Sequence, residues 1–320
     1  GAPPPPALPA PASAAAPVPA GVDAVPGTTP WATSTADLYR VDTAFLGVPD
    51  VRVQDWSLRV HGMVGRELEL RYEDLLAGPL LERWITLTCV SNQVGGELAG
   101  NVRWLGVALA DVLRRVVPDA GADALLARST DGFTTLTPLA DVLDGRDALL
   151  AVGMNGEPLP REHGFPVRMV VPGIYGFASA CKWVTEIEVT RFDSARAYWT
   201  DRGWARRAPV KTASRIDTPR SFARVPAGVV PVAGVAWAQH RGIRAVEVRV
   251  DGGGWQRAEL LPAVSVDTWC QWVWRWDAAP GQHTLQVRAV DGTGAVQTGE
   301  VAEPFPDGAS GYDTLVLTVV

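Results

Sequence analysis

The spacing of apolar residues changes along the chain, and it predicts two folded regions of different character. Short β-branched or alternating runs predict strands at residues 51–60, 85–89, 167–171 and 184–189. Apolar residues at helical spacing predict helices at residues 72–76 and 107–117. The region from residue 31 to residue 207 is therefore expected to mix α and β structure.

From residue 208 to residue 320 the pattern becomes that of an all-β domain. Residues 243–250 and 284–290 alternate, and each run leads into an Asp-Gly sequence that suits a hairpin turn. Trp272, Trp274 and Trp276 recur at period two along one strand and are expected in the core. The chain is thus predicted to be an α+β protein, in which a mixed α/β domain precedes an immunoglobulin-like β-sandwich.

Residues 1–30 are rich in Pro and Ala, with a run of four prolines at residues 3–6. Such a segment buries too little apolar area to offset its ordering entropy, so we expect a disordered linker or tail. The chain starts with Gly rather than Met, and we expect that another segment preceded it.

Composition narrows the function classes. Hydrophobic residues make up 47% of the 320 residues and charged residues 20%, as in ordinary globular proteins. The formal net charge of −6 argues against nucleic acid as a partner, because phosphate binding needs surplus Lys and Arg. Three widely spaced cysteines fit neither a disulfide framework nor a zinc site. Cys270 is expected to be a small buried apolar residue.

Two segments contain candidate functional residues. In residues 86–96 a strand ends at Cys89, and small polar residues and glycines follow that let backbone amides approach a ligand. In residues 163–183, His163, Arg168 and Lys182 alternate with rigid turn residues. Together they suggest an anion-binding loop beside a thiolate, although a well-packed turn is the alternative. Thiolate softness alone does not choose between molybdenum, copper and iron.

Several motifs in the same order resemble the sulfite-oxidase superfamily of molybdopterin-dependent oxidoreductases. They are Cys-Val-Ser-Asn at residues 89–92, Arg-Trp-Leu-Gly at 103–106, Met-Asn-Gly-Glu-Pro-Leu-Pro at 154–160, His-Gly-Phe-Pro-Val-Arg at 163–168 and Ser-Ala-Cys-Lys-Trp at 179–183. The resemblance runs from about Leu38 to the end of the chain. The sequence is most similar to those of actinobacterial members that carry membrane helices before the catalytic part.

The resemblance implies molybdenum held on a molybdopterin that has no added nucleotide, with Cys89 as the protein ligand to the metal. Arg40 and Arg103 would join Cys89 as catalytic residues. For Asp131 the alternative to a cofactor-binding role is a plain turn residue. For Lys182 the alternative is a solvated surface charge. The implied cofactor-binding residues are Tyr39, Arg40, Ser91, Asn92, Asp131, His163, Arg168, Ala180, Cys181 and Lys182.

The resemblance also implies two-electron oxygen-atom transfer on a small sulfur or nitrogen oxo-species. The alternatives are an S-oxide reductase of the same superfamily and a metal-free binding module. Departures from the family pattern weaken the sulfite assignment: Ser91 and Gln93 replace a Gly and an Arg, and Arg40-Val41-Asp42 replaces Arg-Asn-His.

The same resemblance suggests how the chain works with other molecules. We expect a separate electron-transfer partner, either a cytochrome or a membrane quinone system, because the sequence has no CxxCH haem motif. We expect a homodimer through the C-terminal domain, where Trp255 and Trp269 add aromatic surface. The expected location is extracytoplasmic, with a membrane tether upstream of this chain.

Overall fold

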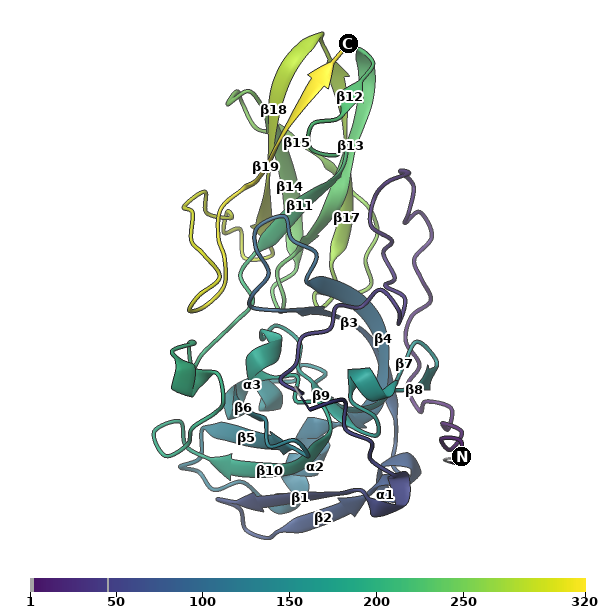
Figure 1. Ribbon diagram of the computed structural model, residues 1–320, viewed down its shortest axis with the longest axis vertical. Coiled ribbons are helices and arrows are strands. Elements are labelled where there is room, and N and C mark those ends of the chain that lie inside the picture. The colour runs from purple at the N-terminus through teal and green to yellow at the C-terminus, as the bar shows by residue number, and fades with distance from the viewer. Residues whose placement is uncertain (1–2, 45) are drawn as a thin grey trace. The chain divides into compact units, whose positions relative to one another are not determined.

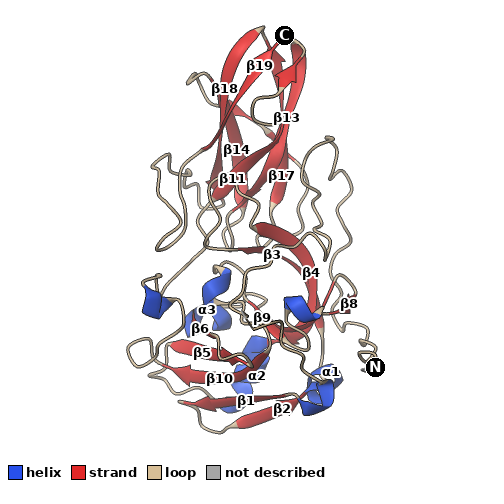
Figure 2. Cartoon of the chain, viewed as in Figure 1, coloured by secondary structure: helices blue, strands red, loops and turns tan. Residues whose placement is uncertain are grey.

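The computed structural model describes residues 3–44 and 46–320 and divides the chain into two units. The first unit comprises the chain up to Ala15 together with Ser34–Cys89 and Val102–Pro209, and the second comprises Ala16–Thr33, Val90–Asn101 and Val210–Val320. Among the described residues, helices occur only in the first unit, and strands dominate the second (Figure 1 and Figure 2). A mixed region followed by a sheet-rich region is thus confirmed. The immunoglobulin-like topology stays a prediction.

Two sheets form the first unit. In one of them β1 and β10 run parallel, and its order is Leu68–Arg71 (β2), Ser57–Gly62 (β1), Val184–Thr190 (β10), Ala124–Ser129 (β5) and Thr134–Pro138 (β6). The other sheet has the order Leu81–Thr88 (β3), Ala99–Ala108 (β4), Leu149–Met154 (β7) and Glu157–Pro158 (β8), with Arg168–Val170 (β9) paired to β7. The chain passes between the two units within β4.

Short helices connect these strands. They are the α-helices Tyr72–Ala77 (α1), Leu109–Val116 (α2) and Leu139–Leu143 (α3), and the 3-10 helices Val53–Asp55 (η1), Arg161–His163 (η2), Gly176–Ala178 (η3) and Thr200–Arg202 (η4). In α2 the buried residues follow helical spacing: Leu109, Val112, Leu113 and Val116. None of the helices in the described part of the chain is long and apolar enough to cross a membrane.

Two predicted elements have different bounds in the structure. The helix expected over residues 107–117 begins only at Leu109, because residues 107–108 complete strand β4. The strand expected over residues 51–60 is wrong in its first half, where η1 forms and β1 starts at Ser57. This turn precedes Trp56, whose side chain is buried and donates a hydrogen bond from Nε1 to the Val184 carbonyl.

The second unit contains two sheets. One has the order Ala213–Thr218 (β11), Gly228–Trp237 (β13), Cys270–Ala278 (β17) and Glu259–Leu260 (β16), and the other has the order Arg224–Val225 (β12), Asp313–Val319 (β19), Gly281–Asp291 (β18), Ile243–Val250 (β14) and Gln256–Arg257 (β15). Residues of both sheets share one hydrophobic core, which includes Val232, Trp272 and Leu285.

The tryptophans of the second unit mostly face its interior. Trp272 and Trp276 lie in the core, and Trp269 is also buried, with its Nε1 donating to the Trp31 carbonyl at 2.8 Å. Trp255 and Trp274 are partly exposed. Most of the aromatic surface expected at a dimer contact is therefore used inside the unit, and the dimer stays a prediction.

The N-terminal segment, expected to be disordered, makes defined contacts in the structure. The Ala12 N–H donates to the Leu80 carbonyl at 2.9 Å, and the Glu82 N–H donates to the Ser13 carbonyl at 2.9 Å. Arg83 also donates to the Ser13 carbonyl and hydroxyl. The reason is that β3 is an edge strand, whose unpaired backbone groups accept even a Pro-rich partner segment.

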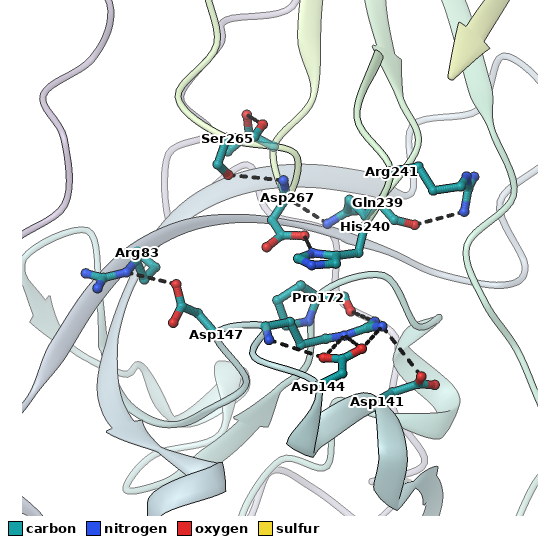
Figure 3. A network of polar contacts seen from close by, with 12 residues as sticks. Arg83, Asp141, Asp144, Asp147, Pro172, Gln239, His240, Arg241, Ser265 and Asp267 are labelled. Carbon is teal, nitrogen blue, oxygen red and sulfur yellow. Dashed lines mark hydrogen bonds and ion pairs between the residues drawn. The ribbon is translucent and has the colours of Figure 1, made fainter. Parts of the chain in front are cut away.

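Polar side chains order loops within each unit. In the first unit, Arg83 pairs with Asp147 at 3.0 Å (Figure 3). In the second unit, Asp267 binds the His240 ring at Nδ1 across 2.7 Å, and its carbonyl accepts a hydrogen bond from Gln239 Nε2 at 2.9 Å (Figure 3). These contacts fix the ends of strands that carry longer loops.

We predict that Gly106→Ala destabilises the first unit. A Cβ at Gly106 would lie 2.2 Å from the carbonyl oxygen of Leu150 in the paired strand β7, so the backbone must move. We expect the free energy of unfolding to fall by about 1–3 kcal/mol, measured by urea unfolding. Gly78→Ala is the control, since its nearest atom would be 3.6 Å away. Equal losses in both variants would contradict the packing argument.

Candidate cofactor site

Cys89 lies directly after strand β3. Ile85 and Leu87, two residues apart on this strand, pack into the core of the first unit. The Cys89 side chain follows at the strand end and is 8% exposed. All three cysteines of the chain are buried thiols. The strand therefore holds one thiol at the edge of the core, where a loop begins.

Tyr39 and Ala180 lie close to this strand end. A Cβ on Gly176 would be 3.5 Å from the Tyr39 hydroxyl, 3.6 Å from the Ala180 Cβ and 3.9 Å from the Thr88 carbonyl oxygen. Burial and the neighbouring Cys89 raise the pKa of Tyr39 well above its ordinary value, so the phenol stays neutral. The structure thus brings Tyr39, Cys89 and Ala180 together around a glycine that leaves the space open.

Arg168 is a buried cation at the start of β9. Its side chain is 5% exposed, and its guanidinium donates to the carbonyls of His163 at 3.2 Å and Met169 at 3.4 Å. It also lies 4.9 Å from the centre of the Trp104 ring, in cation–π geometry. Within the described chain no carboxylate lies within ion-pair distance of it. Burial lowers its pKa to about 10, so it remains charged at neutral pH.

His163 lies beside this cation and is neutral. Burial, then the charges of Arg168 and Lys182, lowers the pKa of His163 to about 4. The next residue, Gly164, has φ +110°, and a Cβ there would lie 3.0 Å from the Arg168 Cβ. A glycine therefore allows His163, Arg168 and Lys182 to approach one another closely.

Lys182 is buried at the other side of Gly164. Its Nζ donates to Asp42 Oδ2 at 2.9 Å and to the Glu162 carbonyl at 3.1 Å, and lies 5.0 Å from the Trp183 ring centre. Burial and the Arg168 charge lower its pKa to about 8, against the upward effect of Asp42. Lys182 is buried and hydrogen-bonded, so it is not the solvated charge that was the alternative.

Asp42 was not expected in the site. Arg40, which was expected there, is largely exposed and donates from Nε to Asp42 Oδ2 at 2.9 Å. Residues two apart in an extended segment point the same way, and this i, i+2 spacing of Arg40 and Asp42 was a signal that the sequence contained. The acidic residue thus joins Arg40 to Lys182.

Cys181 and Asp131, both expected in the cofactor site, lie close enough for the Asp131 charge to act on the Cys181 thiol. Cys181 is fully buried, and burial followed by the Asp131 charge raises its pKa above the ordinary value. Asp131 itself is exposed, and its Oδ1 accepts a short hydrogen bond from the Ser129 hydroxyl and one at 3.2 Å from the Phe133 N–H. Asp131 therefore organises a turn close to Cys181.

The other expected residues lie elsewhere. Arg103 pairs with Glu82 at 3.5 Å and lies 5.8 Å from the Trp84 ring centre, so the structure does not bring it to the cluster. Ser91 and Asn92 belong to the second unit. The Asn92 side chain accepts a hydrogen bond from the Leu98 N–H at 2.9 Å and closes its own loop. Their roles toward a cofactor stay predictions.

The first unit therefore has a buried thiol, a buried guanidinium without a carboxylate and a buried ammonium within one cluster. Charges buried in this way are stable only with an anionic partner or with strong hydrogen bonds. Lys182 has Asp42 as its anionic partner, whereas Arg168 has only carbonyl and aromatic contacts in the described part of the chain, so an anionic ligand would suit Arg168.

Comparison with known proteins identifies the family. Residues 45–199 match the sequence model of the oxidoreductase molybdopterin binding domain. An uncharacterised oxidoreductase of Bacillus subtilis is 36% identical over 149 residues, which are 47% of this chain and 72% of that protein. Human mitochondrial sulfite oxidase is 32% identical over 309 residues, covering 80% of this chain and 56% of that protein. The chain spans about half the length of the mammalian mitochondrial sulfite oxidases it matches.

A solved structure agrees with this similarity. The sulfane dehydrogenase SoxCD of Paracoccus pantotrophus aligns with a TM-score of 0.69 and 27% identity, over 78% of this chain and 71% of that one. The chain belongs to the sulfite-oxidase superfamily of molybdopterin oxidoreductases. Its cofactor is accordingly molybdenum on molybdopterin.

We predict that His163 makes the protein less stable in mild acid. Its pKa is about 4 in the folded state and about 6.5 in the unfolded chain, so protonation favours unfolding. The contribution of neutral His163 is present above pH 6.5 and is lost as the pH falls toward 4. Between pH 7 and pH 5 the loss is about 2 kcal/mol. In His163→Gln, urea unfolding should show a smaller loss over this range. Identical losses in both proteins would contradict the assignment.

Proposed function

We propose that this chain is the catalytic part of a molybdenum-dependent oxidoreductase that acts on a small sulfur oxyanion. The observation that carries the proposal is the buried Arg168, which lacks a carboxylate partner among the described residues and so favours an anionic ligand. The related proteins named above are a sulfite oxidase, a sulfane dehydrogenase and an uncharacterised oxidoreductase. None of these names describes an S-oxide reductase, so that alternative is not favoured.

The residues present fit the cofactor of the family. Arg168 and Lys182 supply buried positive charge for its phosphate, and neutral His163 offers a ring nitrogen for hydrogen bonding. Gly176 leaves open a space that a Cβ would partly fill. The Thr88 hydroxyl next to the thiol is buried and has no partner within the described residues. Cys89 would hold the metal as a thiolate.

When bound, the cofactor supplies two-electron oxygen-atom transfer. For sulfite, the balanced reaction takes sulfite and water to sulfate, two protons and two electrons. The electrons require an acceptor, for which we propose a separate electron-transfer protein or a membrane quinone system. The chain itself would bind the anion, orient it and keep Arg168 in a site of low dielectric, where its charge acts strongly.

We predict that Cys89→Ser removes the activity and leaves the fold intact, because a hydroxyl is a poor replacement for a soft thiolate. The assay is sulfite oxidation with an artificial acceptor, and circular dichroism checks the fold. Cys270→Ser is the matched control, since Cys270 is a buried thiol in the second unit. Wild-type turnover in Cys89→Ser would disprove the ligand assignment.

We predict a high KM for sulfite in the wild type and a lower one in Gln93→Arg. Gln93 stands where sulfite oxidases are expected to have an arginine, and it is exposed. One charge-assisted hydrogen bond contributes about 1.5–3 kcal/mol, which is roughly 10- to 150-fold in affinity. Gln282→Arg, also exposed and also in the second unit but on strand β18, adds the same charge and should leave KM unchanged. A micromolar wild-type KM would show that the arginine is not needed.

A further inference from the structure

Arg215 is a buried cation on strand β11 of the second unit, and its side chain is 7% exposed. Its guanidinium donates three hydrogen bonds. Nε donates to Asp217 Oδ1 at 2.7 Å, Nη2 to the Thr29 hydroxyl at 2.8 Å and Nη1 to the Gly96 carbonyl oxygen at 2.9 Å. One side chain thus joins three segments of this unit: its own strand, the N-terminal segment and the loop that follows Cys89 in the sequence.

The loop over residues 90–98 is closed by hydrogen bonds of its own. The Gly96 N–H donates to the Gln93 carbonyl at 2.9 Å, and the Leu98 N–H donates to Asn92 Oδ1 at 2.9 Å. These bonds fold the loop on itself but fix it to no strand. The bond from the buried guanidinium supplies that attachment, because its acceptor is a backbone carbonyl in the middle of the loop.

Asp313 packs against the neighbouring residue of the same loop. Its Oδ2 accepts a hydrogen bond from the Ile216 N–H of strand β11 at 2.9 Å. Gly95 has φ +77°, and a Cβ there would lie 2.5 Å from Asp313 Oδ1. The loop backbone therefore lies directly against a carboxylate that strand β11 holds in place.

The ion pair of Arg215 and Asp217 is fully engaged. The Asp217 side chain is 8% exposed, and its Oδ2 accepts a hydrogen bond from the Thr29 N–H at 2.9 Å. A buried pair of this kind is stable because each charge has a partner and further hydrogen bonds. The planar fork of arginine can serve three acceptors at once, which the single ammonium of lysine cannot do.

We propose that Arg215 is a positioning residue for the loop that follows Cys89, and that it acts through the Gly96 carbonyl. The loop contains Ser91 and Asn92, whose roles toward the cofactor are predictions, so the benefit to the cofactor rests on the proposed function. A loop that is ordered before the cofactor arrives loses less conformational entropy on binding.

The test measures hydrogen–deuterium exchange of the full chain by mass spectrometry, on peptides that cover residues 90–98. In Arg215→Lys the charge beside Asp217 remains, but the Gly96 carbonyl loses its donor. We expect the protected amides of Gly96 and Leu98 to exchange about tenfold faster than in the wild type. Unchanged exchange in the folded variant would overturn the proposal.

A double variant keeps the test valid if Arg215→Lys does not fold. Arg215→Gln with Asp217→Asn removes both charges of the buried pair and leaves neither unpaired. The same faster exchange is expected, and wild-type exchange would refute the proposal. The difference should persist in a Cys89→Ser background, where loss of the metal cannot account for it. Its absence there would show that the cofactor, not Arg215, orders the loop.

Arg241→Lys is the matched control within the second unit. Arg241 also donates to a carboxylate, Asp291 Oδ2 at 2.9 Å, to a hydroxyl, that of Thr212 at 3.1 Å, and to a carbonyl, that of Gln239 at 3.2 Å. We expect the loop over residues 90–98 to exchange at the wild-type rate in this variant. An equal acceleration would mean that the whole unit has loosened, and would contradict a specific role of Arg215.

Molybdenum content per folded chain is a second readout, which a merely structural role would not move. We expect Arg215→Lys to hold at least about twofold less molybdenum than Arg241→Lys, because a loose loop binds the cofactor less well. Undiminished content would refute the positioning role toward the cofactor. Neither readout needs turnover. A wild type that holds molybdenum but oxidises no sulfite would refute the proposed function and leave the role of Arg215 standing.

Discussion

The buried charge of Arg168 is the constraint on which the rest of the site depends. Removing a cation from water is costly unless hydrogen bonds or an anion compensate. Here two backbone carbonyls and the face of Trp104 compensate in part, and no carboxylate among the described residues does so. The same charge contributes to keeping His163 neutral and to the low pKa of Lys182. A polyanionic cofactor would supply the missing counter-charge.

One sheet of the first unit positions both Cys89 and Arg168. Strand β3 ends at Thr88, directly before Cys89, and β9 begins at Arg168. These strands are linked through β4 and β7, whose hydrogen bonds and buried side chains fix their positions. Because both groups extend from packed strands, their separation does not depend on a mobile loop. Glycines at 164 and 176 then leave room beside them.

Sequence reasoning found the fold class because the periodicity changes sharply near residue 208, and it found the cluster around Cys89, His163, Arg168 and Lys182 through motif order. Three features were beyond it. The pairing of Ser13 with an edge strand is a tertiary contact that composition does not encode. The position of Arg103 beside Glu82 depends on which way a strand residue faces. The contact of Lys182 with Asp42 joins residues 140 positions apart, which local patterns do not connect.

The departures from the family pattern have a common physical theme. Gln93 supplies no charge where an arginine is expected, and Asp42 engages two cations that would otherwise be available. In the first unit, Asp42 lowers the net positive charge around Lys182, while Arg168 has no carboxylate partner among the described residues.

The most direct test of this account is the molybdenum and pterin content of the purified chain, made in a molybdenum-sufficient host, for the wild type and Arg168→Met. Methionine is long enough to fill the apolar space under the guanidinium but carries no charge. The account predicts equimolar molybdenum and pterin in the wild type and a marked loss of both in a folded Arg168→Met. A wild type without pterin, or a variant with undiminished content, would contradict it.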